Sequence, residues 1–339
     1  MKIVVRNALL GGCLMLSLPG HAGITFQFEY TDAPDTGFFD LNYGAARQAV
    51  LNTAASEFSS MFGSIFTNSG TIVLQARTAN ESGTLASAGS NYVLDMGASG
   101  YNLRDIVRTK LTEGKDLNGD KADGTIAINF SASTPWETNF NTAPRPEDGW
   151  WWGDRGTYDF YGTLYHEFTH LLGFSPAMWE DGSTLYDSRG YNTFASFFVD
   201  GYGNSIIDSH TNTLNQDVWN AASIGYSLDG SSNGLFFGGQ AAIAANGGEP
   251  VSLYSPGKWN PGSSASHLNP DIADQGGMMM VPYLAPGRSI REYSDIEVAM
   301  LTDLGYSVAV VPEPETWSMM FAGLALLGSI VRRSTRREV

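Results

Sequence analysis

The chain has 339 residues and a formal net charge of −16, from 19 Lys and Arg against 35 Asp and Glu. Such an acidic chain repels phosphate backbones, which argues against a nucleic-acid-binding protein. Its single cysteine, Cys13, excludes a disulfide framework and a cysteine-ligated zinc site.

Residues 1–22 have the organisation of a secretory signal peptide. Lys2 and Arg6 precede an apolar run over residues 8–18. Gly20 and Ala22 then place small residues at the positions that signal peptidase reads. We therefore expect cleavage after Ala22 and export of the remaining chain.

Strands and helices are both predicted from the hydrophobic patterns that follow. Strands are expected at residues 24–30, 71–79 and 125–130, and helices at 45–62, around 103–111 and at 294–304. The first helix has a predicted buried stripe of Val50, Ala54, Phe58 and Met61. Between about residues 175 and 290 the chain is rich in Gly, Asn and Ser. These patterns indicate an α+β protein.

The segment YDFYGTLYHEFTHLLGF, residues 158–174, contains the clearest chemical motif. Its apolar residues recur at the helical spacing i, i+4, i+7 and i+8, namely Leu164, Phe168, Leu171 and Leu172. His166 and His170 are one helical turn apart, where two imidazoles can bind one zinc ion. Glu167 lies beside them, placed to take a proton from a water activated by the zinc. Gly173 can end the helix in a left-handed conformation.

A catalytic zinc usually has three protein ligands and one water, so a third ligand is required. A compact motif would supply a histidine six residues after His170, but that position is Pro176. The remaining candidates are Glu180, His210 and His267. Glu180 follows Pro176 closely without a helical pattern, and His210 lies in a polar stretch. The sequence therefore favours His267, in GSSASHLNPD, as the third ligand.

The order of HEFTHLLGF, SHL, MVP and TDLGY resembles that of the leishmanolysin-type branch of the metzincin peptidases. In that branch an insertion displaces the third histidine, as the proline at 176 requires. The resemblance implies a metzincin-like zincin fold, with an N-terminal twisted mixed sheet, an active-site helix and a loop-rich C-terminal subdomain. It further implies that the strand at 125–130 forms the sheet edge that binds an extended substrate.

The same resemblance assigns roles to individual residues. It implies that His166, His170 and His267 bind Zn²⁺ and that Glu167 is the general base. Met280 would form the Met-turn beneath the zinc, with Met278 and Met279 as neighbouring alternatives.

A tyrosine follows the predicted Met-turn. Some metzincins have a tyrosine two residues after the Met-turn methionine that helps to stabilise the transition state. Here Pro282 stands at that position and Tyr283 follows it. Tyr283 is therefore a candidate for this role, with a packing role as the alternative.

A second metal-like pattern precedes the strand at 125–130. Oxygen-bearing side chains alternate there as they do in calcium loops, at Asp116, Asn118, Asp120 and Asp123. The segment lacks the bidentate Glu of an EF-hand and contains Lys121. It is either a Ca²⁺ site or a polar turn, and the turn is favoured.

The C-terminus reads as a second sorting signal. Residues 311–314, VPEP, precede an apolar run over 317–331 and an arginine-rich end. The trailing arginines would hold that end in the cytoplasm. The arrangement resembles the PEP-CTERM tail of Gram-negative bacteria, and an ordinary membrane anchor is the alternative. The resemblance implies exosortase as a partner and only transient membrane contact through the tail.

The predicted organisation is a signal peptide at 1–22, a catalytic subdomain at 23–174, a C-terminal subdomain at 175–311 and a sorting tail at 312–339. The predicted function is a secreted zinc endopeptidase that acts on a polypeptide substrate. It would work outside the cell or at the exopolysaccharide-associated cell surface. The alternative is a non-proteolytic exopolysaccharide-matrix or adhesion protein that keeps the metzincin fold.

Overall fold

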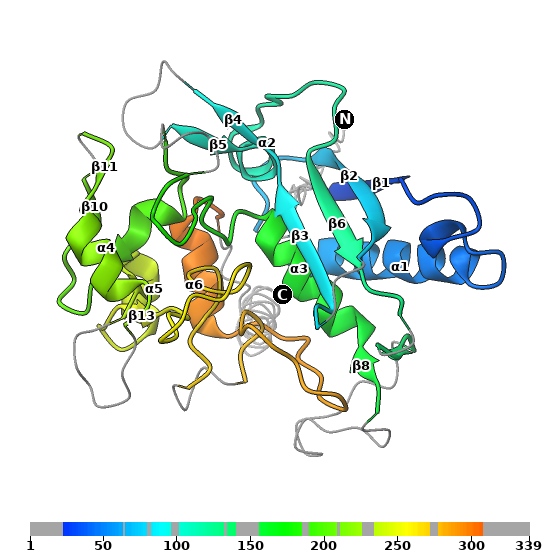
Figure 1. The fold of residues 1–339 in the computed structure, drawn as a ribbon. Coiled ribbons are helices and arrows are strands. Elements are labelled where there is room, and N and C mark those ends of the chain that lie inside the picture. The colour runs from blue at the N-terminus through cyan, green and yellow to red at the C-terminus, as the bar shows by residue number, and fades with distance from the viewer. Residues whose placement is uncertain are drawn as a thin grey trace, which may run out of the picture.

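The structure is a computed structural model. It describes residues 23–63, 65–79, 83–95, 102–131, 134–139, 156–184, 190–208, 211–225, 234–271 and 277–307. Over these ranges helices and strands are mixed, as expected for an α+β protein (Figure 1).

A four-stranded mixed sheet forms the N-terminal part, in the order β1-β2-β6-β3 (Figure 1). Its strands are β1 (Ile24–Tyr30), β2 (Gly70–Thr78), β6 (Gly124–Ile128) and β3 (Ala86–Ser90). The first three run parallel, whereas β3 is antiparallel to β6.

The prediction that the strand at 125–130 forms the sheet edge is wrong. This segment is β6, which pairs with β2 on one side and with β3 on the other. The edge strand is β3, whose sequence ASAGS lacks the β-branched and aromatic residues that mark strands. It is a strand because it pairs with β6 along its whole length.

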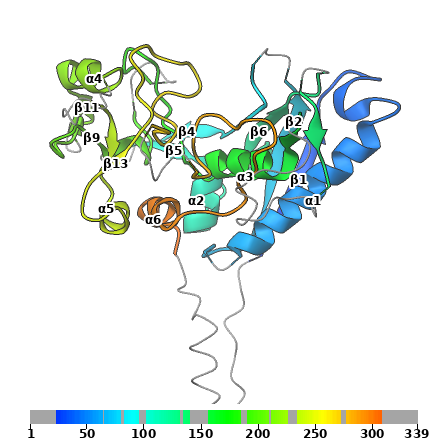
Figure 2. The same cartoon turned by 90° about the horizontal axis from the view of Figure 1, so that it is seen from below.

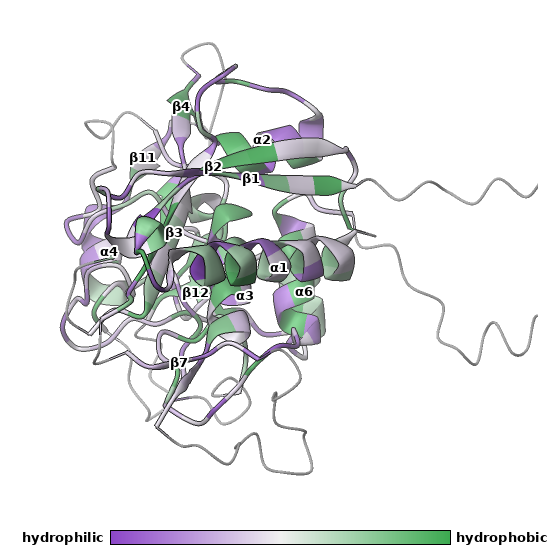
Figure 3. Ribbon diagram, turned by 90° about the vertical axis from the view of Figure 1, so that its right-hand side faces the viewer, coloured by the Kyte–Doolittle hydropathy of each residue, from purple (hydrophilic) through white to green (hydrophobic). Residues whose placement is uncertain are grey.

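Helix α1 (Gly44–Phe62) packs against the sheet with most of the predicted stripe, since Ala54 and Phe58 are buried and Val50 packs against the core. Its buried large side chains are Leu51, Phe58 and Phe62. Met61, predicted to be buried, is 42% exposed. Figure 3 shows hydrophobic and hydrophilic segments alternating along this helix. The stripe is set by Phe58, which contacts Phe62 and Phe168 with ring centroids 4.8 and 5.2 Å apart.

Helix α3 (Phe160–Leu171) carries the histidine motif and lies between the sheet and the loop-rich half (Figure 2). Its N-cap Asp159 accepts a hydrogen bond from the Tyr161 backbone N–H. Arg291 donates to both oxygens of this buried carboxylate, at 2.7 and 2.6 Å, and Ser289 also donates to it. The C-terminal half of the chain therefore fixes the start of α3.

The other elements of the N-terminal half are short. They are η1 (Gly37–Phe39), β4 (Tyr92–Leu94), β5 (Leu103–Asp105), α2 (Ile106–Glu113), β7 (Trp136–Glu137) and β8 (Tyr158–Asp159). The predicted helix around 103–111 is thus α2 preceded by a strand, because Leu103 pairs with Leu94 in β4.

The second half is rich in loops, as predicted. Its elements are η4 (Ala195–Phe197), β9 (Phe198–Val199), β10 (Ile207–Asp208), β11 (Thr213–Leu214), α4 (Gln216–Ala222), β12 (Phe236–Phe237), α5 (Gln240–Ala245), β13 (Val251–Ser252) and α6 (Asp295–Asp303). One hydrophobic core runs through both halves. The Tyr306 hydroxyl joins them by donating to the Leu172 carbonyl over 2.9 Å.

The predicted signal peptide at 1–22 and the sorting tail at 312–339 lie outside the described residues. Within the described ranges, no helix has both the length and the apolar character needed to cross a bilayer. The two ends of the described chain lie near one loop, because Gly23 bonds to Ser69 and Ser307 to Thr67.

We predict that Arg291→Ala lowers the free energy of unfolding by about 3–5 kcal/mol, because it leaves the buried Asp159 carboxylate without its cation. Urea denaturation measures this change. Lys115→Ala is the control, since its ion pair with Glu113 is exposed and worth about 0–1 kcal/mol. Equal effects of the two substitutions would contradict the role given to Arg291.

Candidate metal centre

Three histidines converge at the middle of the molecule. His166 and His170 come from α3, and His267 comes from a loop of the second half. The Nε2 atom of His166 lies 3.1 Å from that of His170 and 3.1 Å from that of His267. The third side of this triangle, between His170 and His267, measures 3.2 Å. The sequence therefore identified all three members of the cluster.

The opposite nitrogen of each ring faces a backbone carbonyl. His166 Nδ1 lies 2.7 Å from the Met279 oxygen, His170 Nδ1 lies 2.8 Å from that of Phe174, and His267 Nδ1 lies 2.9 Å from that of Ser263. A carbonyl only accepts hydrogen bonds, so each Nδ1 must carry the hydrogen. In a neutral ring, each Nε2 then presents a lone pair to the other two.

Burial keeps these rings neutral. It lowers the pKa of His166 to about 4, although the Met279 carbonyl acts in the opposite direction. Burial and then the charge on His166 lower the pKa of His170 to about 3. The pKa of His267 is also well below its usual value, first through burial and then through its two neighbours.

Three facing lone pairs with no donor between them fit a bound cation. A point about 2.05 Å from all three Nε2 atoms, the usual Zn–N distance, subtends N–metal–N angles of roughly 100°, close to tetrahedral. The carbonyl behind each ring is the outer partner that metal-binding histidines commonly have. In the part of the chain that the structure describes, this is the single cluster of three metal-ligating side chains.

Glu167 is buried in the wall of the same cleft, 5% exposed. Burial raises the pKa of its carboxyl to about 8, and a hydrogen bond from the Ala88 backbone in β3 opposes this shift. No basic side chain is among the causes of the shift. The carboxylate is therefore poised to exchange a proton near neutral pH.

The predicted Met-turn passes beside the histidines through its backbone. Met279 supplies the carbonyl behind His166, and the Met280 carbonyl accepts from the Leu268 N–H, next to His267. The Met280 N–H donates to the buried Glu297 carboxylate over 2.7 Å. Both methionines are buried. The turn thus joins two of the three histidines to α6.

A cleft of about 360 Å³ opens onto the three histidines. One wall is the segment 83–88, which includes the start of the edge strand β3. The opposite walls are residues 261–267 and 281–284. Tyr283, 63% exposed, stands at this cleft, so it is available to a ligand rather than packed in the core.

Of the other candidates for the third ligand, the structure describes only Glu180. Glu180 is exposed and lies outside the cluster, and His210 lies outside the described residues. The insertion between His170 and His267 folds as the loop-rich half, which carries His267 back to α3.

The calcium-like loop is closed by a lysine. Lys110 Nζ lies 2.8 Å from a carboxylate oxygen of the fully buried Asp123 and 3.1 Å from one of Asp116. Asn118 donates to two backbone carbonyls of the loop, and Asp120 is exposed. The ammonium group of Lys110 supplies the positive charge expected of Ca²⁺, so the loop fits the polar turn that was the favoured alternative.

Sequence reasoning missed the residues that hold the histidines and Glu167 in place. Phe174, Ser263 and Met279 contribute backbone carbonyls, and Ala88 contributes a backbone N–H. Nearly every residue type has the same backbone groups, so the sequence does not indicate which of them will bind a side chain. Glu297 did have a signal, because it forms a capping box with Ser294 at the start of α6.

Comparison with known proteins identifies the tail. Residues 310–337 match the PEP-CTERM protein-sorting motif. This motif is a sorting signal that exosortase recognises, and it indicates an exported protein of Gram-negative bacteria sorted to the cell surface. No curated protein and no solved structure matches the chain.

We predict that His267→Ala abolishes stoichiometric zinc binding, because two imidazoles of one helix leave the metal without its third protein ligand. Zinc content of the purified protein after dialysis measures this. Glu180→Ala and His210→Ala serve as controls and should retain the metal. Loss of zinc from either control instead of His267→Ala would contradict the assignment.

We predict that Glu167→Gln changes how the stability of the metal-free protein depends on pH. The folded-state pKa of Glu167 is raised from 4.5 to about 8, so its contribution to stability is present at low pH and lost as pH rises through this window. Relative to the glutamine variant, the wild type should lose about 1.4 kcal/mol per pH unit there. Parallel pH profiles in urea denaturation would contradict the shift.

Proposed function

We propose that this chain is an exported zinc-dependent endopeptidase that resembles the leishmanolysin-type metzincins. The observation that carries the proposal is the convergence of three unprotonated Nε2 atoms beside a buried carboxyl in an open cleft. His166, His170 and His267 would hold the metal. Zn²⁺ bound by three imidazoles acts as a Lewis acid on a carbonyl and lowers the pKa of a water to about 7.

Glu167 would handle the proton of the reaction. As general base it takes a proton from the attacking water, and as general acid it passes that proton to the leaving amine. The Ala88 N–H holds the carboxylate at the cleft wall.

The edge strand β3 would bind the polypeptide substrate. The Ala88 N–H bonds to Glu167, so it points away from β6, and Ala86 has the same orientation because backbone direction alternates along a strand. The Leu85 carbonyl, by contrast, accepts from Asn129. The outward Ala86 N–H and the outward carbonyls of Ala86 and Ala88 would pair with an extended peptide, as in strand addition.

Tyr283 would assist from the other side of the cleft. Its hydroxyl belongs to an exposed side chain at the cleft, so it can donate to the oxygen on which charge develops. Met280 would support the metal site from beneath, through the turn that also holds His166. Exosortase would release the enzyme to the exopolysaccharide-associated surface after it recognises the tail.

We predict that Glu167→Gln lowers peptide cleavage by about 10²–10⁴-fold, because it removes the proton-accepting group and keeps the shape of the side chain. The experiment measures cleavage of a peptide library by the exported protein loaded with one equivalent of Zn²⁺, together with its zinc content. Glu180→Gln makes the same chemical change at an exposed residue outside the cleft and should retain full activity.

Two outcomes would overturn the proposal. The first is zinc-loaded wild type that cleaves no member of the library, which would favour the matrix or adhesion protein. The second is a Glu167→Gln variant with wild-type activity, which would place the chemistry elsewhere.

A further inference from the structure

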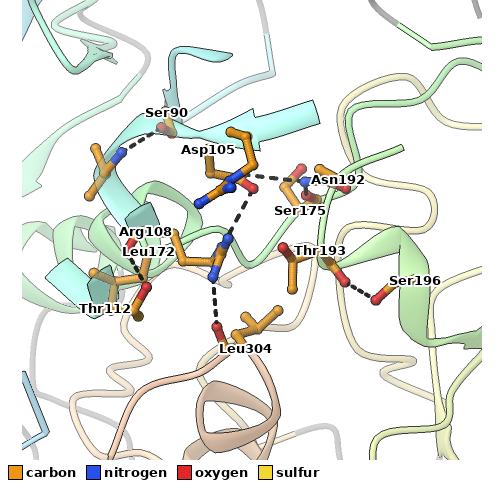
Figure 4. Close-up of polar contacts among 12 residues, drawn as sticks. Ser90, Asp105, Arg108, Thr112, Leu172, Ser175, Asn192, Thr193, Ser196 and Leu304 are labelled. Atoms are coloured by element: carbon orange, nitrogen blue, oxygen red, sulfur yellow. Dashed lines mark hydrogen bonds and ion pairs between the residues drawn. The ribbon is translucent and has the colours of Figure 1, made fainter. Parts of the chain in front are cut away.

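A buried polar cluster packs against the turn that ends α3 (Figure 4). It consists of Asp105 and Arg108 from the α2 region and Asn192 from the second half. Asp105 and Asn192 are fully buried, and Arg108 is nearly so. Neither the proposed chemistry nor the motif on α3 accounts for these three residues.

Asn192 uses both ends of its side chain. Its Nδ2 donates to the Ser175 carbonyl over 2.8 Å and to Asp105 Oδ1 over 3.3 Å. Its Oδ1 accepts from the Ala195 N–H over 3.2 Å. Figure 4 shows Ser175 beside the Asn192 amide and a dashed contact that runs from Asn192 toward Asp105. Because donor and acceptor are both engaged, the amide has one orientation, and it ties the segment after α3 to the start of α2.

That segment aims one of the proposed ligands. The Phe174 carbonyl, one residue before Ser175, accepts from His170 Nδ1 over 2.8 Å. Gly173 has φ +91°, a left-handed conformation that turns the chain back toward the helix end. A Cβ at Gly173 would lie 3.4 Å from the Arg108 side chain and 3.5 Å from Asp105 Oδ1, so the turn packs directly on the cluster.

The charged groups of the cluster keep Asn192 in place. Arg108 Nε lies 3.9 Å from Asp105 Oδ2, and its other nitrogens reach the Leu304 carbonyl at 3.3 Å and Glu113 at 3.8 Å. Burial raises the pKa of Asp105 to about 6, and Arg108 is the main opposing cause. Above that pH the carboxylate is a charged acceptor for the Asn192 amide, and such hydrogen bonds are stronger than neutral ones.

We propose that Asn192 is a positioning residue for the metal centre, which fixes Ser175 and thereby holds the Phe174 carbonyl that orients His170. The inference rests on the proposed zinc site but not on the proposed proteolysis. It assigns to the loop-rich half a second contribution to metal binding, besides supplying His267. Loss of an outer partner of a metal ligand typically weakens metal binding by 10–100-fold, and Asn192 acts one step further out.

The test measures zinc affinity of the folded protein by competition with a chelator at about pH 7.5, where Asp105 is ionised. We expect Asn192→Ala to weaken Zn²⁺ binding by about tenfold. With Co²⁺ in place of Zn²⁺, the visible absorption of the variant should shift, since this spectrum reports the arrangement of the ligands. If the alanine variant does not fold, Asn192→Ser replaces it in the test. Serine keeps a small polar side chain but cannot bridge the same groups, so we expect it to change the Zn²⁺ affinity and the Co²⁺ spectrum in the same directions.

Asn68→Ala is the matched control. The Asn68 amide donates to the Leu111 carbonyl over 3.0 Å and joins two segments of the N-terminal half. We expect this control to lower the unfolding free energy without changing Zn²⁺ affinity or the Co²⁺ spectrum. Unchanged affinity and spectrum in folded Asn192 variants would overturn the inference and leave the metal site intact. Wild type that binds no Zn²⁺ would overturn the site itself and with it the proposed function.

Discussion

Three imidazole nitrogens that face one another within 3.2 Å are the constraint on which the centre of this molecule depends. The contact is unfavourable between neutral rings because lone pair opposes lone pair, and it becomes favourable when a cation lies between them. The protein enforces it with three backbone carbonyls that hold each ring by its other nitrogen. Two of these carbonyls, those of Ser263 and Met279, and His267 itself come from the loop-rich half.

Glu167 shows how the same helix gives neighbouring residues different environments. His166 and Glu167 are adjacent in sequence, yet Glu167 is bound by the edge strand β3 rather than by the second half. Burial without a basic partner raises its pKa, whereas burial lowers the pKa of the histidines, because in both cases the uncharged form is favoured. A strand on one side and loops on the other therefore combine at a single helix, and the cleft lies between them.

The sequence predicted the elements whose chemistry depends on local spacing. The HEFTH spacing placed two histidines one turn apart on α3, and β1 has the predicted bounds, Ile24–Tyr30. The proline at position 176 excluded a compact motif, and the surroundings of Glu180 and His210 left His267 as the favoured third ligand. The failures have a common cause. Strand β3 is made of small residues and is a strand through its pairing with β6, and near the end of α1 it is Phe62 rather than Met61 that is buried, in contact with Phe58.

By itself the sequence determined an acidic chain whose single cysteine lies in the predicted signal peptide, a C-terminal sorting tail and a helix with two histidines one turn apart. These features depend on residue identity and short spacing, which the linear chain contains in full. Only the tertiary structure decided that β3 is the edge of the sheet at the cleft, that Lys110 pairs with the carboxylates of the calcium-like loop and that Asn192 bonds to the Ser175 carbonyl. Those outcomes depend on backbone groups and on residues far apart in the chain, whose proximity is a product of folding.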